Sequence, residues 1–173
     1  MTNPRLKVPP VSSPVIERRP ATEGDRELLF ELFRSALPPE DAFQALPESK
    51  REPLLRAKFD TREQQYRKNY PLADFDVLTV DGKPAGKLYI DRGDDEFVII
   101  DISLLPEFRN RGIGTAVIGR LVEEAGRLVL PVRTRVRHHS PAWRLWRRLG
   151  FERVGDDGTH HEIAVPAIRQ ELQ

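Results

Sequence analysis

The sequence predicts an α/β domain of the α+β type, with a mixed but mostly antiparallel central sheet and helices on both of its faces. Three observations lead to this fold class. Residues 75–105 hold three β-rich segments separated by turn signals. Helical periodicity comes before them, in two segments between residues 22 and 69, and follows directly after them from Ile113 to Ala125. Beyond residue 129, strand patterns return around one more short helix.

The N-terminal part is predicted to form one strand and two helices. Thr22 is a helix N-cap candidate with Asp25 three residues later. Pro53 is tolerated in the first turn of a helix. The predicted elements are a strand over 15–19, a helix that ends near residue 37 before Pro38-Pro39, a loop over 38–52 and a helix over 53–69.

Turn signals and prolines divide the rest of the chain. Pro106 cannot donate to a sheet ladder and should end a strand, and Pro131 places the start of a later strand outside regular pairing. Gly150 should end the last helix. The predicted elements are strands over 75–80, 87–91 and 98–105 joined by turns at 81–84 and 92–95, a helix over 113–125, a strand over 129–137, a helix over 142–149, and strands over 151–154 and 160–165.

The chain of 173 residues is long enough for a single domain with a buried core. Residues 1–14 carry four prolines and no periodicity, so they are predicted to be a flexible tail ahead of one domain over 15–173. No window approaches the roughly 20 apolar residues of a membrane span, and no signal-peptide core is present, so a cytoplasmic location and no membrane partner are expected. The absence of cysteine excludes disulfides, thiolate metal sites and a cysteine nucleophile.

The net charge is only +1, but the positive charge is unevenly distributed. Between Arg109 and Arg153 there are eleven arginines, no lysine and three acidic residues. Such a basic half indicates an anionic partner, either a phosphorylated cofactor or a nucleic acid, unless it is simply a solvated basic face. Nucleic acid is disfavoured because no helix-turn-helix or stacking-aromatic motif accompanies the charge.

A basic turn that contains glycine joins the strand over 98–105 to the following helix. Unpaired amides and the dipole at a helix start favour an anion, above all a diphosphate, and glycine lets the ligand approach the backbone. The turn lacks the lysine of a P-loop, and Val117 stands where a dinucleotide fingerprint needs a small residue. An ordinary connection with solvated arginines is the alternative. The turn and helix start comprise Arg109, Asn110, Arg111, Gly112, Ile113, Gly114 and Thr115.

Two segments of the chain resemble the GNAT superfamily of N-acyltransferases. Leu104-Leu105-Pro106 followed by Arg109-x-x-Gly112-x-Gly114 is similar to the family's acyl-CoA motif. Residues 141–151 are similar to the family segment Asn-x-x-Ala-x-x-Leu-Tyr-x-x-x-Gly-Phe, which lies along the CoA tail. Together with the order of elements, the resemblance covers about residues 15–165.

The resemblance implies a sheet splayed between the fourth and fifth strands, with acetyl-CoA as cosubstrate. The pantetheine would lie in the gap, the loop amides would hold the CoA diphosphate, and the Leu104 N–H would stabilise the oxyanion of a tetrahedral intermediate. The implied cofactor contacts are Leu104, Leu105, Arg109, Asn110, Arg111, Gly112, Ile113, Gly114, Thr115, His139, Ala142 and Trp146.

Two of these residues depart from the family pattern. His139 replaces the asparagine of the second motif, and Trp146 replaces its tyrosine. An indole N–H cannot protonate a leaving thiolate. Either the thiolate leaves without a general acid, or water or another phenol such as Tyr89 supplies the proton, or activity is weak and Trp146 only packs against the pantetheine.

The expected acceptor is an amine, which is mostly protonated at neutral pH and therefore needs a proton acceptor. Asp101 is the predicted base, although pairing with an arginine is an equally good interpretation of this carboxylate; Glu96, His138 and His139 are further candidates. The second helix places Phe59, Glu63 and Tyr66 on one face, which predicts a wall of the acceptor pocket. The alternative is that these aromatic side chains pack on the sheet.

The chain contains two pairs of adjacent histidines, His138-His139 and His160-His161, and histidine is a common metal ligand. Adjacent residues of a strand point to opposite faces, so neither pair is a chelate by itself. No metal is therefore predicted.

The sequence predicts an enzyme, an acetyl-CoA-dependent N-acetyltransferase that acts on an amine of a small molecule, peptide or protein by direct attack. Its partners would be a CoA thioester and an amine acceptor, with a homodimer left open. One alternative is a non-catalytic acyl-CoA-binding or regulatory module on the same fold, which Trp146 favours. A less favoured alternative is an arginine-rich nucleic-acid-binding protein.

Overall fold

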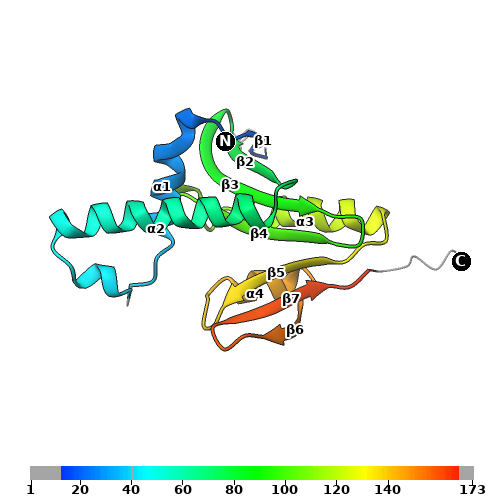
Figure 1. The fold of residues 1–173 in the computed structure, drawn as a ribbon. Coiled ribbons are helices and arrows are strands. Elements are labelled where there is room, and N and C mark those ends of the chain that lie inside the picture. Colours follow the sequence, from blue (N-terminus) through cyan, green and yellow to red (C-terminus); the bar gives the residue numbers. More distant parts are fainter. Residues whose placement is uncertain (1–12, 40, 168–173) are drawn as a thin grey trace, which may run out of the picture.

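The computed structural model describes residues 13–39 and 41–167. Within them, a seven-stranded sheet has the strand order β1-β2-β3-β4-β5-β7-β6 (Figure 1). Neighbouring strands are antiparallel except β4 and β5, which are parallel. The predicted mixed, mostly antiparallel sheet is therefore confirmed. The predicted tail over 1–14 lies outside the described residues apart from its last two.

The helices and strands predicted from the sequence are all present, with some ends displaced. The strands are β1 (Ile16–Pro20), β2 (Asp74–Val80), β3 (Lys83–Arg92), β4 (Phe97–Leu104), β5 (Val132–Arg137), β6 (Glu152–Asp156) and β7 (His160–Val165). The helices are α1 (Arg26–Ser35), α2 (Glu48–Asn69), α3 (Ile113–Arg127) and α4 (Trp143–Arg148), with short 3-10 turns at Glu23–Asp25, Ala42–Ala45 and Pro106–Phe108.

The sheet separates two apolar layers. On one face, α1 and α2 cover a core that includes Leu32, Phe33, Phe59 and Tyr89. On the other face, α3 and α4 cover a larger core that includes Phe151. Figure 1 shows α2 crossing in front of the sheet and α3 behind it. The prediction of helices on both faces is confirmed.

The start of the first helical segment is stabilised by Asp25, as the N-cap pattern predicts. Its carboxylate accepts hydrogen bonds from the Thr22 backbone N–H at 2.8 Å and from the Arg19 guanidinium through two bonds of 2.8 Å each. These bonds, those from Arg19 first, hold the pKa of Asp25 well below its usual value. Strand β1 and helix α1 are thereby joined through a buried carboxylate.

Helix α2 begins earlier than predicted. It starts at Glu48, so Pro53 lies inside the helix rather than in its first turn, and the predicted start at Pro53 is wrong. The Arg51 side chain explains the extra turn, because it donates to three backbone carbonyls of the preceding segment, those of Phe43, Gln44 and Leu46. Those bonds tie the helix start to the preceding 3-10 turn and offset the hydrogen bond that Pro53 cannot donate.

The hairpin between β2 and β3 is tighter than predicted. Asp81 and Gly82 both have positive φ angles, 50° and 78°, which is typical of a two-residue type I′ turn. Strand β3 therefore begins at Lys83, and a register shift opposite Leu78 and Thr79 accommodates Pro84 within it. At the other end of the sheet, β5 begins at Val132, directly after Pro131, as expected.

None of the helices within residues 13–39 and 41–167 combines the length and the apolar character needed to cross a membrane.

Candidate active site

The parallel pairing of β4 and β5 covers only residues 97–99 of β4 and 132–134 of β5. Both strands continue, β4 to Leu104 and β5 to Arg137, with no ladder between them. The Thr134 hydroxyl marks the point of divergence, because it donates to the Ile99 carbonyl at 2.8 Å from a buried position. The sheet is therefore splayed between its fourth and fifth strands, and two backbone edges face each other across the gap.

A β-bulge in β4 explains why the strands diverge at this point. Ile99 pairs with Ile90 of β3, whereas Asp101 pairs with Tyr89, so Ile100 is an extra residue in the β4 ladder. A bulge bends its strand and increases the local twist, and here it begins directly after the last residue that pairs with β5. Nothing in the sequence marks this bulge, since it carries neither glycine nor proline.

The end of β4 is fixed by a close approach to β3. The Leu105 N–H donates to the Ala85 carbonyl at 2.8 Å, so strand alternation turns the Leu104 N–H toward the gap. Gly86 pairs with Leu104, and a Cβ at Gly86 would lie 2.3 Å from the Ser103 carbonyl oxygen. Only glycine permits this contact, and sequence reasoning did not single it out.

The turn before α3 combines two left-handed residues, Asn110 with φ 57° and Gly112 with φ 77°. Gly112 is the N-cap, and the first bond inside the helix runs from the Ala116 N–H to the Gly112 carbonyl at 3.0 Å. The amides of residues 113–115 therefore have no acceptor within the helix. This turn follows β4, so its free amides lie at the open end of the splay.

The two arginines of this turn have different surroundings. Arg109 is engaged by the protein: its Nε donates to the Leu104 carbonyl at 2.9 Å, and its guanidinium also donates to the Ser35 hydroxyl at 3.0 Å. It joins the end of β4 to the end of α1. Arg111 is exposed and makes one long bond of 3.4 Å to the Glu107 carbonyl, so its charge is available to an anion.

The second predicted cofactor segment follows β5. His139 adopts a positive φ of 59° in the turn, and Ala142 is partly buried against the core below α4. Trp146 is 5% exposed and packs edge-on against Phe151, with 4.9 Å between the ring centroids. The indole is thus a core side chain, and its contact with a cofactor stays a prediction.

Asp101 belongs to a buried ionic cluster beneath α2. Its carboxylate oxygen Oδ2 lies 2.9 Å from the Lys87 Nζ and 3.3 Å from the Arg62 guanidinium, and it accepts the Tyr66 hydroxyl at 3.3 Å. The Lys87 side chain is only 3% exposed. Burial raises the pKa of Asp101, but Lys87 and Arg62 outweigh it and hold that pKa below its usual value. Asp101 is thus a weak proton acceptor.

Glu63 and Tyr89 complete the cluster. The Tyr89 hydroxyl donates to Glu63 Oε2 at 2.8 Å, while Glu63 Oε1 is buried without a hydrogen bond and lies 3.6 Å from the Lys87 Nζ. Burial raises the pKa of Tyr89, as does the neighbouring Glu63. Because this phenol is buried and already donates to a carboxylate, it is poorly suited to protonate a leaving thiolate.

A groove of about 700 Å³ lies between α2, the turn from β3 to β4, and strands β4, β5 and β7. Its lining includes residues 98–100 and 133–135, which are the last two paired positions of β4 and β5 and the first position beyond the pairing. Five acidic side chains line it together with three arginines and a histidine: Asp91, Asp94, Asp95, Glu96, Glu162, Arg62, Arg133, Arg135 and His160.

His160 is the groove residue that sequence reasoning missed as a candidate base. Partial burial lowers the pKa of His160 below its usual value, and the charges of Arg135 and Arg137 lower it further. The imidazole is therefore neutral at physiological pH and can accept a proton. Strand alternation was the available signal, since it places His160 and His161 on opposite faces of β7.

The remaining predicted residues are dispersed. Tyr66 lines the groove, but Phe59 is 2% exposed and packs between Phe30 and Phe33, so the structure does not bring it to the groove. Glu96 lines the groove and pairs with Arg133 at 3.0 Å. The other two candidate bases, His138 and His139, lie outside the set of groove residues.

The seven-stranded sheet with one parallel pair, β4 and β5, and helices on both faces is the fold of an acetyltransferase domain. Residues 31–151 match the model of the Acetyltransferase (GNAT) family. The chain therefore belongs to the GNAT family of acetyltransferases, which are N-acyltransferases. No curated protein matches the sequence closely enough to count as a relative.

Solved structures share the fold at low sequence identity. The PaiA N-acetyltransferase from Thermoplasma acidophilum, in complex with coenzyme A, has a TM-score of 0.64 at 18% identity, over 88% of this chain and 99% of its own. An acetyltransferase from Thermus thermophilus has a TM-score of 0.62 at 21% identity, over 87% and 96%. The ribosomal-protein-S18-alanine N-acetyltransferase from Escherichia coli has a TM-score of 0.58 at 17% identity, over 92% and 99%.

Proposed function

We propose that this protein is an acetyl-CoA-dependent N-acetyltransferase that acetylates an amine of a small molecule, peptide or protein by direct attack. The observation that carries the proposal is the splay between β4 and β5, with the free amides at the start of α3 lying at its open end. A coenzyme A complex of a structural neighbour supports a CoA thioester as the donor.

The chain offers each part of a CoA thioester a suitable partner. The amides of residues 113–115 and the exposed Arg111 would bind the diphosphate at the helix N-terminus. The open edges of β4 and β5 would pair with the amide groups of the pantetheine. The Leu104 N–H would donate to the thioester carbonyl and stabilise the oxyanion, an interaction worth about 3–4 kcal/mol in the transition state.

The groove on the α2 face would receive the acceptor amine. Its acidic side chains attract a cationic ammonium group, and it reaches the residues at which β4 and β5 diverge. His160, neutral because its pKa is lowered, would take the proton from the ammonium group before or during attack. Asp101, held ionised by two cations, is the alternative base that the sequence predicted.

No tyrosine stands where the family motif places one, and Trp146 is buried. The thiolate would therefore leave unassisted or take its proton from water, which its moderate basicity allows. If it cannot, the domain is a non-catalytic acyl-CoA-binding module, the second candidate function. The buried Trp146 is the observation that favours this candidate.

Thermal unfolding with acetyl-CoA and thiol release with an amine panel separate these functions. A ligand at 100 times its Kd adds about 2.7 kcal/mol of stability, so saturating acetyl-CoA should raise the Tm clearly. An enzyme also releases CoA thiol in proportion to added amine, whereas a binding module shows the Tm shift alone. No Tm shift at millimolar acetyl-CoA would contradict both.

The pH profile of kcat/KM tests the base. Wild-type activity should fall on the acid side only below the ordinary histidine pKa of about 6.5, because the pKa of His160 is lowered. His160→Ala should lower kcat/KM and remove this acid limb. If His160→Ala keeps the wild-type profile while Asp101→Asn loses activity, the base is Asp101.

A further inference from the structure

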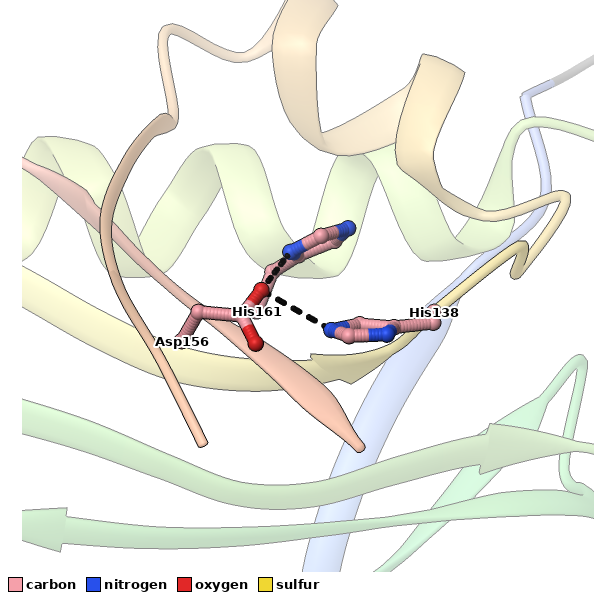
Figure 2. Close-up of side chains that lie close together, drawn as sticks. All are labelled: His138, Asp156 and His161. Carbon is pink, nitrogen blue, oxygen red and sulfur yellow. Dashed lines mark hydrogen bonds and ion pairs between the residues drawn. The ribbon is translucent and has the colours of Figure 1, made fainter. Parts of the chain in front are cut away.

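One histidine from each adjacent pair meets a carboxylate on the face of the sheet opposite the groove. His138 follows β5, Asp156 ends β6 and His161 lies in β7. The His138 Nε2 and the His161 Nδ1 both lie against Asp156 Oδ2, at 2.8 Å and 2.7 Å (Figure 2). These three side chains come from three segments and converge on one point.

The strand register explains the convergence. His161 pairs with Val136 of β5 on one side and with Asp156 of β6 on the other, because β7 lies between those two strands. The His138 N–H continues the ladder by donating to the Thr159 carbonyl at 3.0 Å. Since His138 is two residues beyond Val136, the pleat places it on the same face as His161.

The other members of the two pairs behave differently. His160 lines the groove on the α2 face, and His139 occupies the turn before α4. His160 and His161 therefore obey the rule that adjacent strand residues point apart, whereas His138 and His139 both lie in the turn after β5, with 6.3 Å between their ring centroids. That rule does not exclude a site built from one histidine of each pair, so the sequence argument against a metal leaves this arrangement open.

We propose that His138, Asp156 and His161 form a binding site for a divalent transition-metal ion, with Zn²⁺ the ion best matched to the donor set. Two imidazole nitrogens and a carboxylate oxygen are ligands that Zn²⁺ accepts, and a site with three protein ligands leaves a position for water. The three ligand atoms lie within 4.8 Å of one another. Zn²⁺ distances of about 2.0–2.2 Å require the donors to separate only slightly, which small side-chain rotations supply.

Two further contacts favour a ligand role over an ordinary hydrogen-bonded cluster. The second oxygen of Asp156, Oδ1, accepts the Gly158 N–H at 2.8 Å, which orients the carboxylate while Oδ2 faces the imidazoles. The His138 and His161 rings lie 4.2 Å apart between centroids, with an interplanar angle of 30°, and each ring directs a nitrogen at Asp156 Oδ2. The side chains are 24–38% exposed, which gives an ion and its water ligands access.

Metal binding here would link the hairpin of β6 and β7 to the turn that follows β5. The chain has four histidines, all within these two pairs, so a set of single variants covers every imidazole. His138→Gln, His161→Gln and Asp156→Asn remove a ligand, and His139→Gln and His160→Gln are matched controls. Any affinity tag is removed before measurement.

The experiment is calorimetric titration of the intact protein with Zn²⁺ and, separately, with Co²⁺, whose visible absorption reports nitrogen ligation. The expected result is one ion per chain, reversed by EDTA and accompanied by a rise in Tm. Each ligand variant should weaken Zn²⁺ binding at least tenfold, while each control variant binds as wild type.

Absence of saturable Zn²⁺ and Co²⁺ binding to the wild type would overturn the proposal. Equal weakening in the His139→Gln and His160→Gln variants would also overturn it, because the ion would then sit elsewhere. Circular dichroism of each variant identifies any variant that fails to fold. If a histidine variant fails to fold, Asp156→Asn, which keeps the contact with the Gly158 N–H, supplies the decisive comparison with the wild type. Binding does not depend on acetyl transfer, so an inactive protein would leave this result unaffected.

Discussion

Adding a negative charge at the start of α3 should stabilise the fold and weaken acetyl-CoA binding at the same time. Thr115 is exposed and is the third residue of α3, counted from Ile113. Thr115→Glu places a carboxylate beside the free amides, where the helix dipole favours it by about 0.3–1 kcal/mol. Thr115→Gln introduces a side chain of nearly the same size as glutamate but without its charge. The comparison of the two variants therefore isolates the effect of the charge.

The effect on binding follows from Coulomb's law. A carboxylate about 6 Å from a phosphate charge repels it by about 0.7–3 kcal/mol for effective dielectric constants between 80 and 20. Since about 1.4 kcal/mol corresponds to a factor of ten, the two phosphates together should make Thr115→Glu bind acetyl-CoA about tenfold or more weakly than Thr115→Gln. Calorimetric titration measures Kd, and urea unfolding measures stability. Equal Kd values for the two variants would refute a diphosphate site at these amides.

Three further substitutions test the structure around the site. Gly86→Ala should destabilise the protein by about 1–3 kcal/mol in urea unfolding, because its Cβ meets the β4 backbone; wild-type stability would contradict the close approach of β3 and β4. Asp101→Asn should lower the free energy of unfolding by about 3 kcal/mol, because it breaks the buried ion pair with Lys87. This is the low end of the range for such a change, since Lys87 keeps the Glu63 carboxylate nearby. A loss below about 1 kcal/mol would contradict the buried pairing. Asp25 has a lowered pKa in the folded state, so its stabilising effect is present above about pH 3.9 and is lost as the pH falls below it. Asp25→Asn should flatten the fall in urea stability between pH 5 and pH 3 relative to the wild type, and an unchanged slope would contradict the pairing with Arg19.

Local sequence patterns predicted the elements of the fold because each element carries its own signal. Pro131 excluded the start of β5 from the sheet, and the N-cap pattern of Thr22 and Asp25 marked the first helical segment. The start of α2 was mispredicted because contacts of the Arg51 guanidinium with the preceding turn outweigh the local preference at Pro53.

The sequence predicted the site less completely than the fold, because the site depends on contacts between segments that are distant in the chain. The bulge at Ile100 has no local signature, and the need for glycine at position 86 arises only from its approach to β4. Arg109 looked like a phosphate ligand in the motif, yet its guanidinium holds the ends of β4 and α1 together. Strand alternation separates His160 from His161, but the groove that His160 lines is formed mainly by residues of α2, β4 and β5, which the local sequence does not place beside it.

A crystal structure with bound acetyl-CoA would show whether the protein holds a CoA thioester in the splay between β4 and β5. We expect the diphosphate against the amides of residues 113–115, the pantetheine between β4 and β5, and the thioester carbonyl within hydrogen-bond distance of the Leu104 N–H. Acetyl-CoA bound elsewhere, for example along the exposed arginines of β5 and α4, with the gap empty, would contradict it.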